Sequence, residues 1–299
     1  MSDKYFKREW PLHLLILPGV IITVMFSYIP MTGIVMAFQK YLPAKGIFHS
    51  KWIDLDNFQY LISIPGVYQV LFNTVFIAIM KIIAGLVIPV TFALLLNEIS
   101  NKHIKKAIQT SVYLPHFLSW VILSGILIDI LSPGTGFINQ ILTGIGLKPV
   151  FFLGDSAVFP YTMVATDVWK EFGFSAIIYL AALSGVDVTL YEAAVMDGAN
   201  RWKQTWHVTL PGITPIIVLM TALSLGNVLN AGFDQIFNLY SPVVYSTGDI
   251  IDTLIYRIGI QQAQYSLATA AGLFKSVISF VLIATSYKLA DKYANYKIF

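Results

Sequence analysis

Six long apolar runs, separated by shorter polar segments, dominate the pattern of this 299-residue chain. Each run is close to or longer than the roughly 20 residues that an α-helix needs to cross the hydrocarbon core of a bilayer. The runs lie at about 12–36, 70–96, 107–131, 159–183, 213–231 and 267–289. The pattern therefore predicts an all-α membrane protein in which six transmembrane helices form a single domain over residues 1–299.

Composition agrees with this interpretation. Hydrophobic residues make up 57% of the chain and charged residues only 12%, with a mean hydropathy of +0.71, which leaves too few polar groups to cover a soluble globule. The chain has no cysteine, which excludes disulfides, thiolate metal sites and cysteine nucleophiles. The net charge of +3 is concentrated in a few loops, so we expect the lipid bilayer and no nucleic acid as a partner.

The basic residues indicate the orientation of the spans. One side of the predicted membrane carries Lys40, Lys45, Lys51, Lys148 and Arg257. The other side carries more of them, and the positive-inside rule makes that side cytoplasmic. Six spans then place both termini in the cytoplasm. The cytoplasmic set comprises Lys4, Lys7, Arg8, Lys102, Lys105, Lys106, Arg201, Lys203, Lys288, Lys292 and Lys297.

The cytoplasmic segment between the fourth and fifth runs has clear turn chemistry. Thr189 precedes Glu192 by three residues, which matches a capping box and predicts that a short helix starts there. Gly198 suits the left-handed residue that ends a helix, and Asn200 suits the cap of a second helix. Pro211 fits the first turn of the next membrane helix, so we expect the excursion to end at this point. The segment is therefore predicted to be a bent helix pair beside the bilayer.

The same segment follows a longer spaced pattern. Glu-Ala-Ala is followed by three residues, Gly, nine residues, an aliphatic residue, one residue and Leu-Pro. This spacing resembles the EAA loop, here about 187–211, of permease subunits in type I binding-protein-dependent ABC importers, with Val208 where the family usually has Ile. The resemblance implies a cytoplasmic coupling helix between helices 4 and 5. The ATPase-coupling residues that it implies are Glu192, Ala193, Ala194, Asp197, Gly198, Leu210 and Pro211.

Two stretches near the start of the chain narrow the resemblance. The run from Phe26 to Gly33, with Ala37-Phe38-Gln39-Lys40-Tyr41 after it, looks like the LplB-like oligosaccharide branch of the carbohydrate-uptake class. The stretch Trp52 to Phe58 is similar to a Gly-Leu-x-Asn-Phe motif, with Asp54 in place of Gly; an interfacial segment explains it equally well. The branch implies the type I ABC importer permease fold in a bacterial cytoplasmic membrane.

Family resemblance also implies partners and a mechanism. It implies a heterodimer with a second homologous permease, two ATP-binding cassette ATPase domains that bind ATP and Mg, and an extracytoplasmic solute-binding protein that delivers an oligosaccharide by alternating access. The sequence itself has no GxxxxGK[ST] phosphate loop and no catalytic constellation. Its five histidines have no metal-ligand spacing. We therefore expect no enzyme activity, catalytic residue, metal or cofactor in this chain.

Polar residues within the runs suggest a substrate pathway, because each is costly in hydrocarbon. Asn227, Asn230 and Asp234 are spaced three and then four apart, which predicts one face of the fifth helix. This stripe suits sugar hydroxyls, and interhelical hydrogen bonding explains it equally well.

The fourth run carries a second polar cluster of Asp167, Trp169, Lys170 and Glu171. We expect Lys170 to pair with Asp167 within one turn, either lining the pathway or fixing helix packing. Two further intramembrane lysines, Lys81 and Lys275, are candidates either to neutralise Glu171 from another helix or to face a water-filled cavity.

Other functions also fit parts of the pattern. A type I permease for amino acids, peptides or another solute shares the EAA loop. A secondary transporter or channel needs no ATPase, and a structural scaffold needs neither the loop nor buried charge. The ATP-driven importer subunit is therefore the reading that accounts for most of the chain.

Overall fold

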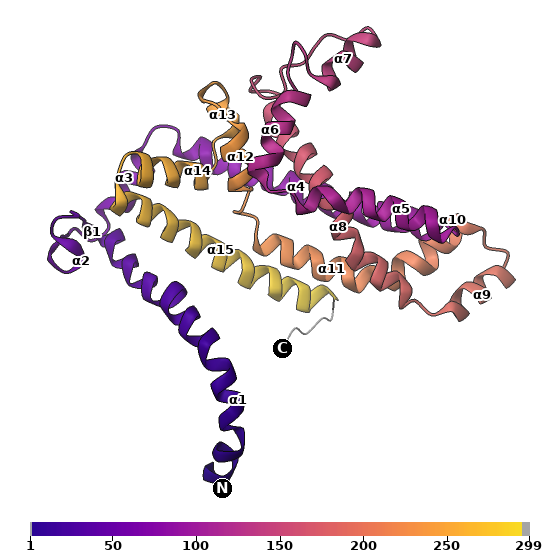
Figure 1. Ribbon diagram of the computed structural model, residues 1–299, viewed down its shortest axis with the longest axis horizontal. Helices are drawn as coiled ribbons and strands as arrows, with labels where there is room; N and C mark the ends of the chain where they lie inside the picture. The colour runs from indigo at the N-terminus through magenta and orange to yellow at the C-terminus, as the bar shows by residue number, and fades with distance from the viewer. Residues whose placement is uncertain (1, 295–299) are drawn as a thin grey trace. The chain divides into compact units, whose positions relative to one another are not determined.

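A computed structural model describes the backbone of residues 2–294 and the side chains of residues 10–286 and 288. Lys297 and the side chains of Lys4, Lys7, Arg8 and Lys292, which were assigned to the cytoplasmic side, lie outside this description. The described residues are mostly helical, with one two-stranded ribbon (Figure 1). Their contacts divide the chain into two compact units, Met1–Ile64 with Ile255–Phe274 and Pro65–Leu254 with Lys275–Phe299.

Between four and six helical stretches among the described residues match membrane spans by length and composition. Trp10–Phe38, Val67–Asn97, Arg201–Gly226 and Tyr265–Ser286 qualify by themselves. Two further candidates are pairs of helices with a bend between them: Lys102–Phe117 with Trp120–Ile130, and Phe159–Ser184 with Val188–Met196. The expectation of an all-α membrane protein agrees with these helices.

The first unit begins with three consecutive helical segments and a small ribbon. Asn57 holds the ribbon, because its side-chain amide donates to the carbonyls of Ala37 and Gln39 at 2.8 and 3.0 Å. Asp54 has φ of +49°, a conformation that glycine adopts most readily and Asp tolerates, at the position where the resembling motif has Gly. The unit comprises α1 (Ser2–Thr23), η1 (Val24–Tyr28), η2 (Ile29–Phe38), β1 (Gln39–Lys40), α2 (Gly46–His49), β2 (Lys51–Trp52), α3 (Asp56–Ser63), η6 (Arg257–Gln261) and the first part of α15 (Tyr265–Ala294).

The second unit is a helix bundle in which α8 packs against α4, α5 and α11 (Figure 1). One part of its apolar core joins Val90 of α4, Tyr179 of α8 and Ile213 of α11. The unit comprises α4 (Val67–Asn97), α5 (Lys102–Tyr113), η3 (Leu114–Phe117), α6 (Trp120–Ile130), α7 (Phe137–Gly144), α8 (Phe159–Ser184), α9 (Val188–Met196), α10 (Arg201–Gln204), η4 (Thr205–Thr209), α11 (Leu210–Gly226), α12 (Phe233–Leu239), η5 (Pro242–Val244), α13 (Tyr245–Gly248), the first four residues of α14 (Ile251–Tyr256) and the rest of α15.

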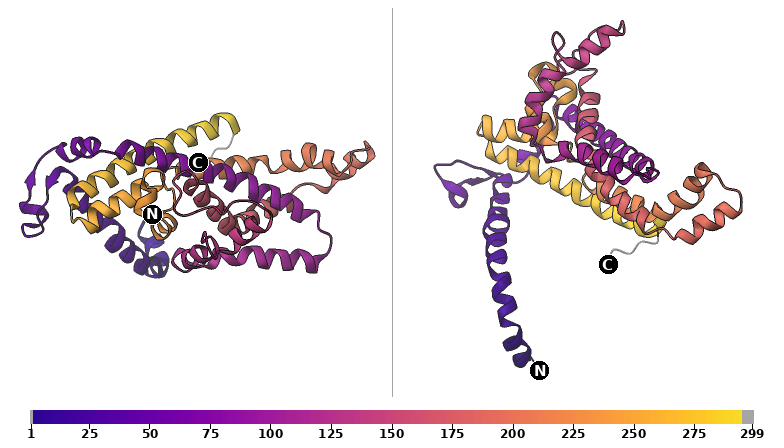
Figure 2. Two further views of the ribbon diagram at one scale, coloured as in Figure 1. Left: turned by 90° about the horizontal axis from the view of Figure 1, so that it is seen from above. Right: turned by 45° about the vertical axis from the view of Figure 1, so that its right-hand side comes forward.

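The two ends of this bundle carry different elements. The short helices α9 and α10 lie at one end, whereas α6, α7, α12 and α13 gather at the other (Figures 1 and 2). At the end with α10, Glu98, which directly follows α4, faces Arg201. At the opposite end, Asn73 near the start of α4 donates to the carbonyl of Ser246 in α13. The bundle therefore separates α9 and α10, which contain the predicted coupling loop, from α6, α7, α12 and α13.

Two predicted spans differ from the observed helices. The run 107–131 is not one helix, because α5 with η3 and α6 meet at 106°. Pro115 begins the tight turn of η3, and Ser119 caps α6 by accepting from the N–H of Ile122. The run 213–231 is also interrupted, since α11 ends at Gly226 and a separate α12 begins after Gly232, whose φ is +96°.

Candidate functional site

The bent helix pair is fixed first by a cap at its start. The carboxylate of Asp187 accepts the backbone N–H of Thr189 at 2.9 Å, and α9 begins at Val188. This hydrogen bond favours the ionised form and holds the pKa of Asp187 below its usual range. The prediction that Thr189 is the cap was therefore wrong by two residues, because the aspartate in front of it satisfies the exposed N–H.

A left-handed glycine and a second cap form the bend of the pair. Gly198 has φ of +75°, and no heavy atom lies within 4 Å of the position that a Cβ would take there. The backbone conformation, and not lack of space, therefore requires glycine. Asn200 then accepts the N–H of Lys203 at 2.9 Å and caps α10. Both sequence predictions are confirmed at these positions.

Buried polar contacts attach α9 to the helix that follows. The hydroxyls of Tyr191 and Thr209 are 3.0 Å apart, and the amide of Gln204 donates to the carbonyl of Ala199 at 2.9 Å. Gln204 and Thr209 are both buried. These bonds tie the bend to the base of the next helix, so that the pair is a fixed extension of that helix.

The predicted end of the excursion at Leu210-Pro211 differs from the structure. Pro211 lies in the first turn of α11 as expected, but α11 continues the helix that precedes it. Instead α10, η4 and α11 form one helical stretch, Arg201–Gly226. The wider π-helical turn of η4 ends at Thr209, two residues before Pro211, whose nitrogen has no N–H to donate within the helix.

The outer surface of the pair combines one acid with apolar side chains. Glu192, Ala193 and Asp197 are exposed, and Met196 next to them is 87% exposed. A cavity of about 600 Å³ lies inside the bend and is bordered by Tyr191, Glu192, Val195, Met196, Arg201 and Gln204. Large exposed apolar side chains beside a carboxylate are typical of a surface that binds another protein.

A second polar region lies within the bundle, around Lys81 of α4. Its ammonium donates to Asp167 of α8 at 3.0 Å, to the carbonyl of Ala231 at 2.8 Å and to the side-chain oxygen of Gln235. Three acceptors match the three N–H donors of a lysine. Lys81 thus connects α4 and α8 to the chain between α11 and α12. The predicted pairing of Asp167 with Lys170 was wrong.

Lys170 belongs to a different cluster, at the bend between η3 and α6. It contacts the carboxylate of Glu171 at 2.6 Å and donates to the carbonyl of His116 at 3.0 Å. The ring of His116 contacts the other oxygen of Glu171 at 2.6 Å and stacks on Phe174. The cluster holds the bend against α8, and the neighbouring Trp169 is 45% exposed. Neither Lys81 nor Lys275 is the observed partner of Glu171.

The predicted stripe of Asn227, Asn230 and Asp234 is not one helix face. Asn227 and Asn230 lie in the interruption after α11, whereas Asp234 lies in the first turn of α12. Lys275 of α15 contacts Asn230 at 2.7 Å and Asp252 at 2.5 Å. All three predicted residues are exposed. The structure brings Asn230 together with Lys275 and leaves Asp234 apart from them.

Sequence reasoning missed Gln235, Thr166 and the role of His116. Gln235 is fully buried, and its amide donates to Thr166 at 2.7 Å and to the carbonyl of Met163 at 2.8 Å. The signal in the sequence was Gly232, because glycine suits the left-handed residue at which a new helix containing Gln235 begins. Among the side chains that the structure describes, no group of three or more His, Asp or Glu is placed to hold a metal ion.

Comparison with known proteins covers almost all of this chain. The family model for a binding-protein-dependent transport system inner membrane component matches residues 85–294. Protein LplB of Bacillus subtilis is 38% identical over 293 residues, covering 98% of this chain and 92% of LplB. The polygalacturonan/rhamnogalacturonan transport system permease protein YteP of Bacillus subtilis is 39% identical over 288 residues, covering 96% of this chain and 90% of YteP.

Solved structures of ABC transporters are similar to this chain in fold as well as in sequence. A chain of a bacterial ABC transporter involved in the import of the acidic polysaccharide alginate has a TM-score of 0.89 and 39% identity, covering 97% of this chain and 98% of that one. A chain of the alginate transporter in complex with its alginate pentasaccharide-bound periplasmic protein also has a TM-score of 0.89, with 38% identity and 97% coverage of both chains. This chain therefore belongs to the family of binding-protein-dependent transport system inner membrane components, the membrane-embedded permease subunits of ABC importers.

Proposed function

We propose that this chain is the permease subunit through which an ATP-driven importer carries an oligosaccharide delivered by a solute-binding protein. The observation that carries the proposal is similarity at 38 and 39% identity along nearly the whole chain to permeases of LplB and YteP type and to the alginate transporter. The name of YteP specifies polygalacturonan and rhamnogalacturonan, and the two solved structures are described as importing the acidic polysaccharide alginate and as binding an alginate pentasaccharide. Oligosaccharides are thus the substrate class.

The proposed topology has six crossings in one permease domain over residues 1–299. The chain lies in the bacterial cytoplasmic membrane with both termini in the cytoplasm. The 26 residues of α8 extend about 39 Å, more than the roughly 30 Å of the hydrocarbon core, so α9 is not needed to complete that crossing. α9 is then a cytoplasmic helix at the membrane surface, which agrees with the basic residues at that end of the bundle.

In this scheme α9 is the coupling helix that sits in a groove of an ATPase domain. Glu192 is the anchoring acid, and Ala193 and Ala194 allow close approach of the two backbones. Asp197 and Gly198 hold the turn. Because α10 runs without interruption into α11, a push on α9 reaches Leu210-Pro211 and the membrane span as a rigid-body movement.

The proposed substrate pathway combines two kinds of residue. Exposed Trp169, Asn227, Asn230 and Asp234 offer a ring face, amides and a carboxylate to sugar rings and hydroxyls. Lys170 is buried, and its ammonium already contacts Glu171 and the carbonyl of His116. We therefore assign Lys170 and Glu171 to holding the bend beside the pathway, and not to direct contact with the sugar.

The remaining parts of the importer are separate subunits. A second homologous permease completes the pathway, two ATP-binding cassette ATPase domains bind ATP and Mg, and an extracytoplasmic solute-binding protein presents the substrate. This chain itself contributes no catalytic residue and binds no cofactor. Closure of the ATPase pair moves α9, and the two permeases switch from outward to inward opening.

A substrate panel tests the proposal. The complete importer is purified with its solute-binding protein and reconstituted in vesicles, and ATP hydrolysis is measured with acidic oligosaccharides, neutral oligosaccharides, amino acids and peptides. We expect stimulation by oligosaccharides only. Stimulation by amino acids or peptides alone would assign the chain to another substrate class. Solute uptake that continues without ATP would indicate a secondary transporter.

A further inference from the structure

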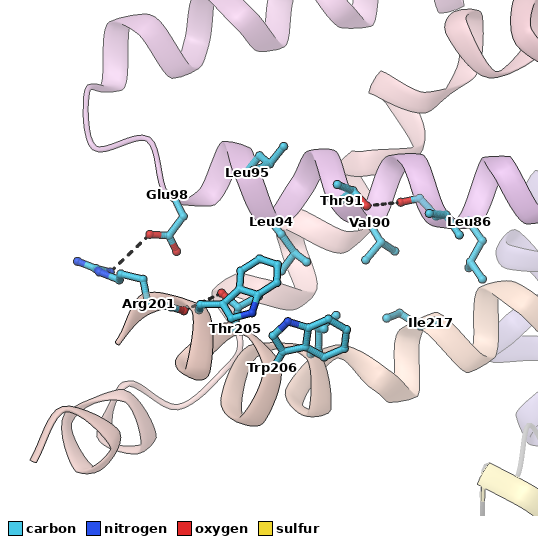
Figure 3. A pocket seen from close by; sticks show the side chains of 13 residues that line it. Leu86, Val90, Thr91, Leu94, Leu95, Glu98, Arg201, Thr205, Trp206 and Ile217 are labelled. Atoms are coloured by element: carbon cyan, nitrogen blue, oxygen red, sulfur yellow. Dashed lines mark hydrogen bonds and ion pairs between the residues drawn. The ribbon is translucent and has the colours of Figure 1, made fainter. Parts of the chain in front are cut away.

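An apolar groove separates α4 from the helix formed by α10, η4 and α11 (Figure 3). Its volume is about 450 Å³. Leu86, Val90 and Leu94 form part of the α4 wall, and Trp206 and Ile217 form part of the opposite wall. The groove shares Arg201 with the cavity inside the bend, and its other lining residues belong neither to that cavity nor to the polar clusters around Lys81 and Lys170.

The length of the groove along α4 matches the thickness of one leaflet of a bilayer. Its α4 wall extends from Leu86 to Glu98, which corresponds to about 18 Å along a helix. Half of a typical hydrocarbon core is about 15 Å thick. A groove of this length, with one end at the base of the coupling segment, therefore spans the cytoplasmic leaflet in the proposed orientation.

The mouth of the groove has an accessible cation. Arg201 lies 3.6 Å from Glu98, and the two side chains are 83% and 51% exposed. A pair this exposed is weak, so the guanidinium is able to bind a second anion. Trp202 and Trp206, both exposed, line the same end. Tryptophan beside arginine is typical of the depth at which lipid headgroups lie.

The walls offer almost nothing to an extended peptide. The hydroxyl of Thr91 donates to the carbonyl of Val87, and the hydroxyl of Thr205 donates to the carbonyl of Arg201, so both hydroxyls are used within their own helices. A peptide backbone needs hydrogen-bond partners at membrane depth, whereas an acyl chain needs none. The chemistry of the groove favours a lipid tail below a phosphate.

We propose that this groove binds an anionic phospholipid of the cytoplasmic leaflet, with an acyl chain between α4 and α10–α11 and its phosphate at Arg201. The orientation rests on the proposed topology, but binding itself depends only on the groove. The bound chain would fill the space beside η4, the turn that connects the coupling segment to α11. The lipid would therefore act as a spacer that keeps η4 at a constant distance from α4.

Lipid retention by the purified complete importer tests the proposal, independently of any transport substrate. The complex is exchanged into mixtures of phosphatidylglycerol and phosphatidylcholine, and retained lipids are counted by native mass spectrometry. We expect selective retention of phosphatidylglycerol. Arg201→Gln should weaken it about tenfold by removing a charge-assisted hydrogen bond, while Lys203→Gln on the same helix should change it less than about twofold.

Two further variants examine the tail site. Thr91→Trp fills the groove and should abolish the selective retention, whereas equal retention in that variant would overturn the proposal. Equal losses in Arg201→Gln and Lys203→Gln would also overturn it, because they would indicate general surface charge.

The chain has no native cysteine, so Thr91→Cys provides a single attachment point for a cross-linker. Cross-linking from it to the second permease would show that a protein helix occupies the groove and would refute the lipid.

Discussion

The helix pair α9–α10 and the polar centre around Lys81 use similar residue types but are held together in opposite ways. In the helix pair the decisive bonds are local, since Asp187 binds an N–H two residues away and Asn200 binds one three residues away. Around Lys81 the partners are 86, 150 and 154 positions away along the chain. One region is specified by neighbours in sequence and the other by neighbours in space.

This difference suits the two regions to different tasks. A locally capped helix pair keeps its shape while it moves, because its bonds move with it. A network that joins α4, α8 and the α11–α12 interruption exists only while those segments remain packed. The first region suits a moving contact with an ATPase, and the second suits a frame that fixes helices relative to one another.

Breaking the network should have the largest effect. Lys81→Met leaves Asp167 without its cation and should destabilise the chain by roughly 3 kcal/mol, because removing one partner of a mostly buried pair leaves an uncompensated charge. Thermal unfolding of the purified subunit measures this loss. Lys148→Met, which changes an exposed lysine, should alter stability by less than about 0.5 kcal/mol.

A double variant sharpens this prediction. Combining Lys81→Met with Asp167→Leu removes both charges and should recover part of the lost stability. If the two substitutions destabilise additively, the ion pair does not hold the bundle and the contrast between the two regions fails.

Close helix packing should give the next largest effect. A Cβ on Gly173 of α8 would clash with the backbone carbonyl of Val112 in α5, so Gly173→Ala should cost about 1–3 kcal/mol. The matched control is Gly85→Ala in α4, where a Cβ meets nothing within 4 Å and unfolding should change little. Equal unfolding temperatures for the two alanine variants would show that α5 and α8 do not pack this closely.

Changing the turn glycine should affect the local region alone. Gly198→Val forces a β-branched residue into φ of +75°, at a cost of about 1–2 kcal/mol in the turn. We expect normal membrane insertion but loss of substrate-stimulated ATP hydrolysis in the assembled complex. Gly198→Asn, which tolerates this conformation, should retain stimulation. Normal substrate-stimulated ATP hydrolysis in Gly198→Val would contradict the proposed coupling role of this turn.

Titration of the α9 cap should have the smallest effect. The pKa of Asp187 is lower in the folded chain than the unfolded value of about 3.9, so its ionised form stabilises α9 above that pH. This contribution disappears as the pH falls through the lower, folded-state pKa. Hydrogen exchange at the Thr189 amide should show the loss of protection. Asp187→Asn keeps a capping oxygen that does not titrate, and an identical pH profile in both proteins would contradict the assignment.

Much of the local structure followed from the sequence. The left-handed Gly198, the cap at Asn200 and Pro211 in the first turn of α11 were predicted correctly, because each depends on the chemistry of a few adjacent residues. The cap at Asp187 was missed because Thr189 and Asp187 both suit that role. Only the backbone conformation distinguishes between them.

Side-chain pairing within the bundle did not follow from the sequence. Lys170 has one acid, Asp167, three residues before it and another, Glu171, directly after it. Only the packing of η3 against α8 directs its ammonium to Glu171 and to the carbonyl of His116. Likewise, the apolar run 107–131 contains enough hydrophobic residues for one span, but its bend brings His116 to Glu171. Hydrophobicity records burial in lipid and does not record where a helix turns.

The sequence by itself determined that the chain is a helical membrane protein with a capped helix pair between its fourth and fifth apolar runs. The length of an apolar run and the residues that cap a helix are local properties, so both can be read directly from one amino-acid sequence. Tertiary structure alone decided the partners of Lys81, Lys170 and Lys275 and the interruption between Gly226 and Phe233. Those outcomes depend on which distant segments meet in the bundle, where an unpaired charge is too costly to remain.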